Sequence, residues 1–150
     1  MALAEGIKNI ANGLLDVYKD YKADLEIDEK DFFLHDVPQE FTLPALLVRL
    51  QTANLTRLNS QEGRWHCVFS VEYAYPMMSE PDRTEKLLDV LATLLIITLQ
   101  HPTLKSNSFS TETSEAMART WGDSGRNQGV EAVAFSVEIF NEPVDITPII

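Results

Sequence analysis

The clearest hydrophobic pattern in the chain lies in residues 64–75, where positions of two kinds alternate. One face of this segment carries Trp65, Cys67, Phe69, Val71, Tyr73 and Tyr75. The other face carries His66, Val68, Ser70, Glu72 and Ala74. Because side chains of a strand alternate between two faces, this spacing predicts a strand whose aromatic face packs against helices.

The second strong pattern predicts a helix over residues 82–100. One stripe at helical spacing consists of Leu87, Leu88, Leu91, Leu94, Leu95 and Leu99, and the apolar surface spreads further through Val90, Ala92, Ile96 and Ile97. Ser79 and Pro81 are typical of a helix start, and Pro102 ends the segment. A helix that is apolar all round needs cover on several sides. It is therefore either deeply buried or covered by a neighbouring subunit.

Weaker patterns fill the first third of the chain. Apolar residues at three- and four-residue spacing predict an amphipathic helix over about residues 2–22. Residues 20–40 hold eight acids against two lysines, which indicates a solvated surface, and they lack the spacing of a calcium-binding loop. Within them, the short apolar centre of Asp31–Asp36 predicts a brief strand or turn.

A hairpin is predicted next. Leu46, Val48 and Leu50 share one face of a strand that begins after Pro44, while simple alternation places Arg49 and Arg57 together on the other face. Residues 59–63 have turn composition and lead directly into the strand 64–75. An antiparallel hairpin is the simplest connection.

The last third predicts a polar loop over about 103–129, with a short strand within 111–121, then a strand over 130–140 and an extended tail over 141–150. The prolines of the tail exclude it from the centre of a sheet. Taken together, the 150 residues predict a single α+β domain. Its mostly antiparallel sheet has about four to five strands, with the N-terminal helix and the long helix packed on one face.

Charge and composition change this picture in two ways. The net charge of -11 argues against a nucleic-acid-binding protein, because such proteins need a basic surface. It suits a protein that lines a channel through which DNA passes without adhering. Simple solubility explains the charge equally well. The single cysteine excludes an intramolecular disulfide and favours a reducing compartment. The N-terminus does not resemble a signal peptide, and the apolar run 87–99 is too short for a membrane span.

Candidate chemistry is sparse. The three histidines are far apart, and His66 and Cys67, as neighbours on a strand, point to opposite faces and cannot form a nucleophile–base pair. Cys67 is interpreted as a small core residue. Motifs for dinucleotides, phosphates or a serine nucleophile do not occur. The sequence therefore predicts no enzyme, no metal site and no cofactor.

The element order resembles the tail terminator proteins of tailed phages, or the tail-completion proteins that act at the same place. Those are small α+β proteins with an N-terminal helix, a hairpin, a long helix and two closing strands joined by a variable loop. The segments that carry the resemblance are Leu55–Asn59, Trp65–Tyr73, the helix 82–100 and Val133–Phe140.

The resemblance implies a structural virion protein of the tail or neck, assembled in the host cytoplasm. It implies a hexameric ring that caps the tail tube, ends tail polymerisation and meets the head connector, and in contractile tails also the sheath protein. DNA would pass through the lumen without specific binding. The residues predicted to meet another subunit or partner are Arg49, Arg57, Ile96, Ile97, Trp121, Arg126, Ile149 and Ile150. Of Ile96 and Ile97, the one that faces outward is expected to matter for assembly, and the arginines are expected to bind a carboxylate on a neighbouring subunit.

Two alternatives stay open. One keeps the phage setting but assigns the role of a head–tail connector or tail-tube subunit. The other is a cytosolic ligand-binding or enzymatic α+β domain that uses the aromatic face of the strand 64–75 as a pocket.

Overall fold

The strand β3 (Glu62–Tyr75) lies at the centre of the sheet. The computed structural model describes residues 2–38, 40–75, 80–101, 110–120, 131–140 and 143–146. Within them, β2 (Ala45–Arg57) and β5 (Glu131–Phe140) flank β3 and run antiparallel to it. β4 (Ser110–Thr120) extends the sheet beyond β5, and the short β1 (Phe32–Leu34) pairs with β2 in parallel. The two-residue β6 (Val144–Asp145) pairs with the start of β3.

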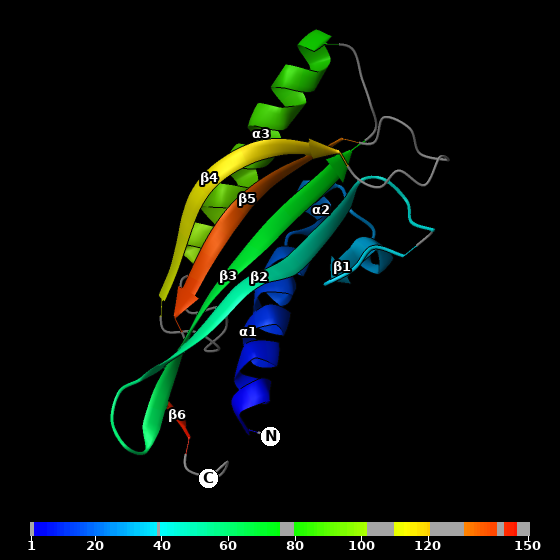
Figure 1. Cartoon of the computed structure of the whole chain (residues 1–150). Helices are drawn as coiled ribbons and strands as arrows, with labels where there is room; N and C mark the ends of the chain where they lie inside the picture. Colours follow the sequence, from blue (N-terminus) through cyan, green and yellow to red (C-terminus); the bar gives the residue numbers. More distant parts are fainter. Residues whose placement is uncertain are drawn as a thin grey trace.

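Two long helices lie on the same side of this sheet (Figure 1). These are α1 (Ala2–Lys19) and α3 (Glu80–Gln100), with the short helix α2 (Lys22–Leu25) and the 3₁₀ helix η1 (Glu29–Asp31) leading from α1 to β1. The predicted α+β class, with an N-terminal helix and a long helix on one face of a mostly antiparallel sheet, is confirmed. The predicted first helix is interrupted after Lys19, and α2 follows as a separate turn.

The main core forms between the helices and the aromatic face of β3. Phe69, Val71 and Tyr73 of β3 are fully buried, together with Leu14 of α1 and Leu94 of α3. Burying side chains of this size contributes about 1.5–3 kcal/mol each. The prediction that this face of the strand packs against helices is confirmed, and so is the interpretation of Cys67 as a core residue.

The opposite face of the sheet is covered at one end by the segment that follows β1. A small cluster of Ala45, Leu47, Ala74 and Ala132 is buried there. The side chains packed against it are Phe33, Val37, Phe41 and Leu43. A tight turn starts this segment: His35 has a positive φ of 72°, and the N–H of Asp36 donates to the carbonyl of Leu34 at 2.9 Å. Such a γ-turn is strained and uncommon, and here it sends the chain across the sheet.

A β-bulge in β2 corrects one prediction. The register pairs Leu50 with Phe69 but Ala53 with Cys67, so one extra residue is inserted between Leu50 and Thr52. An inserted residue reverses the alternation of faces beyond it. Arg49 therefore lies on the face away from the helices, and Arg57, paired with Gly63, lies on the helix side. Their predicted location on one face is wrong.

The predicted hairpin turn is confirmed. The side-chain oxygen of Asn59 accepts hydrogen bonds from the N–H groups of Gln61 and Glu62, both at 2.8 Å. This closes the turn with the local side-chain bonding that asparagine favours. Residues 54–62 are all exposed, so the β2–β3 hairpin end projects beyond the core (Figure 1).

The predicted strand within residues 111–121 is confirmed as β4, and the predicted closing strand as β5. The rest of the predicted loop, 103–109 and 121–129, lies outside the described residues, as do residues 141–142 and 147–150 of the predicted tail.

Candidate partner-binding surfaces

The outward side of α3 exposes an apolar stripe, which we call the α3 stripe. It consists of Leu88, Ala92, Ile96 and Leu99. Leu88, Ile96 and Leu99 are 58%, 54% and 57% exposed. Residues at this spacing lie along one side of a helix. Within the described part of the chain, the second apolar face of this helix is therefore left largely uncovered.

The inward side of α3 is buried through Val90, Leu94 and Ile97. Ile97 is only 3% exposed and belongs to the main core. Of the two isoleucines predicted as candidates for an interface, Ile96 faces outward, and Ile97 is not accessible to a partner. The two differ because consecutive residues lie about 100° apart around a helix.

Two polar links fix the C-terminal half of α3, one from Tyr18 of α1 and one from Tyr21, which lies between α1 and α2. The buried Tyr18 hydroxyl donates to Oγ1 of Thr98, which in turn donates to the carbonyl of Leu94 at 2.8 Å. Three residues further on, the Tyr21 hydroxyl lies 2.8 Å from Nε2 of His101, and the two rings pack edge to face. Burial raises the pKa of Tyr18 well above its usual value. The links hold α3 in a defined orientation, which in turn defines the direction of the α3 stripe.

The link between Tyr18 and Thr98 leads to a testable expectation. Tyr18→Phe should lower the free energy of unfolding by about 1–2 kcal/mol, because it removes one buried hydrogen bond and leaves Thr98 bonded to Leu94. Urea unfolding followed by circular dichroism measures the loss. In a double-mutant cycle with Thr98→Val the two losses should not add. Fully additive losses would show that the hydroxyl groups are not coupled.

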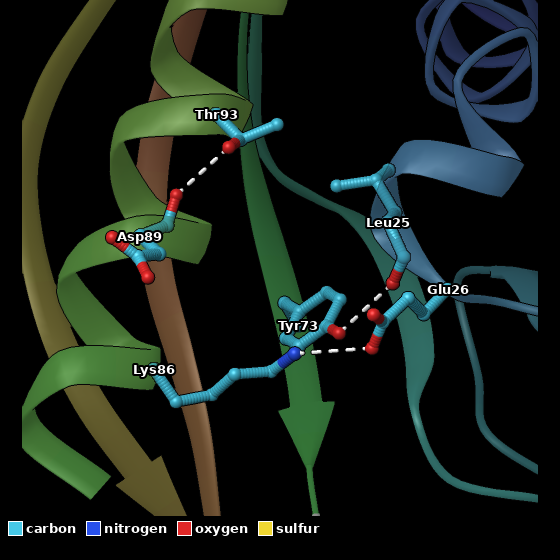
Figure 2. A network of polar contacts seen from close by, with 6 residues as sticks. All are labelled: Leu25, Glu26, Tyr73, Lys86, Asp89 and Thr93. Atoms are coloured by element: carbon cyan, nitrogen blue, oxygen red, sulfur yellow. Dashed lines mark hydrogen bonds and ion pairs between the residues drawn. The ribbon is translucent and has the colours of Figure 1, made fainter. Parts of the chain in front are cut away.

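A second network joins the N-terminal half of α3 to α2 across β3 (Figure 2). The Tyr73 hydroxyl donates to the carbonyl of Leu25 at 3.0 Å, and Nζ of Lys86 lies 3.3 Å from Oε2 of Glu26. Burial, and then the negative charge of Glu26, raise the pKa of Tyr73. The cavity at this place has a volume of about 90 Å³, well below the usual size of a ligand pocket. This network is structural.

A larger pocket of about 550 Å³ lies beside β1, and we call it the β1 pocket. It is lined by Lys30, Asp31, Phe33, Pro38, Glu40, Phe41 and Thr42. Asp31 is buried although the sequence indicated a solvated acidic run. The signal that distinguishes it is its position directly before the apolar Phe32–Leu34, at the start of a strand.

The two arginines predicted to meet a carboxylate are both exposed. Arg49 has no hydrogen bond or ion pair within the described part of the chain. Nε of Arg57 donates to the carbonyl of Asn59 at 3.2 Å. Because the bulge separates their faces, the two arginines do not form one patch.

The two neighbouring residues considered for catalysis, Cys67 and His66, are held by packing and ring contacts. Cys67 is fully buried, and burial raises its pKa to about 11, so the reactive thiolate is scarce at neutral pH. The His66 ring stacks on Phe140 with centroids 4.5 Å apart, and its Nε2 lies 3.6 Å from Oε1 of Glu138.

Among the described residues, no three His, Cys, Asp or Glu side chains gather closely enough to hold a metal ion. None of the helices in the described ranges is both long and apolar enough to cross a membrane.

The other residues predicted to meet a partner, Trp121, Arg126, Ile149 and Ile150, lie outside the described residues. Comparison of the chain with protein-family models and with curated proteins gave no match.

Proposed function

We propose that this protein is a structural component of a phage tail, and that it forms a ring on the end of the tail tube. The ring ends tail polymerisation and joins the tail to the head connector. Six subunits form the ring, as in the tail terminator proteins that the sequence resembles. The α+β fold, with its central hairpin, long helix and closing strands, supports this proposal because it has the element order of those proteins.

The α3 stripe is the observation that carries the proposal. Leu88, Ile96 and Leu99 are each more than half exposed on one side of a single helix. Large apolar side chains in a row mark contact surfaces. Burying the exposed half of each contributes about 1 kcal/mol. A contact of this kind between subunits of a ring removes the stripe from water.

The acidic charge of the chain supports the same proposal. With a formal charge of -11 on each chain, a ring is strongly negative as a whole. An assembly of this charge repels the phosphate backbone of DNA, which favours passage of DNA without adhesion.

A head–tail connector or tail-tube subunit also assembles into rings, so the α3 stripe suits that alternative equally. An assembly reaction with purified tail-tube protein distinguishes the two. A terminator stops tube growth, whereas a tube subunit extends it.

The ligand-binding alternative depended on the aromatic face of the strand 64–75. That face packs against α1 and α3 in the described structure, with Phe69, Tyr73 and Tyr75 fully buried. A ligand-binding function would need a different pocket.

Ile96→Glu tests the proposal. The wild-type protein should form oligomers in light scattering and rings in electron micrographs. Ile96→Glu should weaken assembly at least about tenfold, because it places a charge in a desolvated contact, and should leave the monomer folded. Asn12→Glu on α1 adds the same charge at another exposed helix position and should still form rings. A wild-type protein that stays monomeric even with tail-tube protein would refute the ring.

A further inference from the structure

A buried carboxylate with one oxygen that lacks a partner forms part of the lining of the β1 pocket. Asp31 is only 2% exposed. Its Oδ1 accepts a hydrogen bond from the N–H of Thr42 at 3.1 Å, whereas Oδ2 has no partner within the described structure. A buried carboxylate oxygen without a partner is costly, so its presence indicates a group that arrives from outside.

The walls of the pocket indicate the chemistry of that group. Phe33 and Phe41 lie edge to face with ring centroids 6.3 Å apart, and aromatic rings attract cations. The neighbouring ammonium of Lys30 donates to Oγ1 of Thr42 at 3.0 Å and makes no ion pair with Asp31. Among the described residues, no ion pair neutralises the carboxylate. A guanidinium suits this site best, because it bonds a carboxylate and stacks on an aromatic ring at the same time.

The chain presents such a group at its projecting hairpin end. Arg57 is exposed, and only its Nε is used, in the bond to the carbonyl of Asn59. Its terminal nitrogens make no hydrogen bond or ion pair within the described residues. Leu55 and Leu58 on either side are 40% and 45% exposed, so the arginine is flanked by apolar side chains that match the aromatic walls of the pocket. Arg49 is less suited, because it lies on the face of the sheet rather than on a projecting end.

β1, beside the pocket, and the β2–β3 hairpin end lie at opposite ends of β2 (Figure 1), so Arg57 and Asp31 cannot meet within one chain. Phe32, which follows Asp31, pairs with Leu46 at the start of β2, and Arg57 is the last residue of that strand. At about 3.3 Å per residue the separation is roughly 35 Å.

We propose that Arg57 at the hairpin end of one copy enters the β1 pocket of a second copy and pairs with Asp31. Each copy then contributes its hairpin end to one neighbour and its pocket to another. Head-to-tail contacts of this kind close into rings when the rotation between copies allows it. The contact rests on the proposed ring function and specifies how neighbouring subunits recognise each other.

Affinity measurements test the pairing. Asp31→Asn keeps an oxygen for the Thr42 N–H and removes the charge, and Arg57→Gln removes the guanidinium. Each should raise the dissociation constant of self-association, measured by analytical ultracentrifugation, at least about tenfold. The dissociation constant of the double variant should not exceed the higher of the two single-variant values, because the two substitutions remove the same contact. Lys8→Gln, which removes an exposed positive charge on α1, should behave as wild type. If Asp31→Asn fails to fold by circular dichroism, Arg57→Gln and the cross-link below decide.

A cross-link tests the direction of the contact. Thr42→Cys places a thiol in the β1 pocket, and Leu58→Cys places one beside Arg57, while the native Cys67 is buried. When the two variants are mixed and oxidised, disulfide-linked pairs should contain one chain of each kind, and either variant alone should give few. Rings that form with wild-type affinity in Asp31→Asn and Arg57→Gln, and give no mixed pairs, would overturn the contact and leave the ring intact. A protein that is monomeric at every concentration would overturn both.

Discussion

Ile97→Glu should unfold the protein or lower its free energy of unfolding by more than about 4 kcal/mol. The change removes a core side chain from contact with the sheet and places an unpaired carboxylate among apolar neighbours. A loss of that size is a large part of the 5–15 kcal/mol that stabilises a typical domain. Urea unfolding followed by far-ultraviolet circular dichroism measures it.

The adjacent residue provides the matched control. Ile96 is 54% exposed, so Ile96→Glu should change the stability of the monomer by no more than about 0.5 kcal/mol. The same substitution at neighbouring positions thus separates folding from assembly. Equal and large losses in both variants would show that the outward side of α3 is also part of the core.

Stability should fall steeply above pH 9. Cys67, Tyr18 and Tyr73 are buried, and burial raises the pKa of each above its value in the unfolded chain. Below the unfolded pKa values both states hold the protons, and the stability is fully present. As the pH rises, the unfolded chain loses protons that the folded chain keeps, so the free energy of unfolding falls by about 1.4 kcal/mol per pH unit for each group.

The thiol begins this fall and the tyrosines steepen it. The unfolded thiol ionises near pH 9, and the folded thiol only at a pKa of about 11. Urea midpoints measured at pH 8, 9, 10 and 11 should decrease throughout, with the steepest fall above pH 10. Cys67→Ala should keep a flat profile up to about pH 10, because it lacks the first group to ionise. An unchanged profile in this variant would show that Cys67 does not contribute.

Partner recognition was harder to read from the sequence than the fold. The sequence indicated that an arginine of the hairpin strand binds a carboxylate of a neighbour, but the chain has 23 acidic residues, and the position of Asp31 directly before an apolar segment is only a weak signal. Asp31 is distinguished by burial, by its bond to Thr42 and by its unused oxygen. Those properties depend on the segment that folds back over the sheet after β1, which no periodicity indicates.

The prediction that the two arginines share one face of the strand was wrong for a similar reason. Simple alternation placed Arg49 and Arg57 together, and a single inserted residue between Leu50 and Thr52 separates them. Nothing in the local composition marks this bulge, because it is set by the register that β2 adopts against β3. A one-residue shift of register reverses every side chain beyond it.

The sequence by itself determined the elements that depend on local periodicity. The strand 64–75 with its aromatic face inward, the turn at 59–63 and the long apolar helix follow from spacings of two and of three to four residues, which each segment carries without its neighbours. The tertiary structure alone decided which side of that helix is covered. It buried Ile97, left Ile96 exposed and moved Asp31 out of water, because burial depends on which surfaces meet, and segments far apart in the chain supply those surfaces.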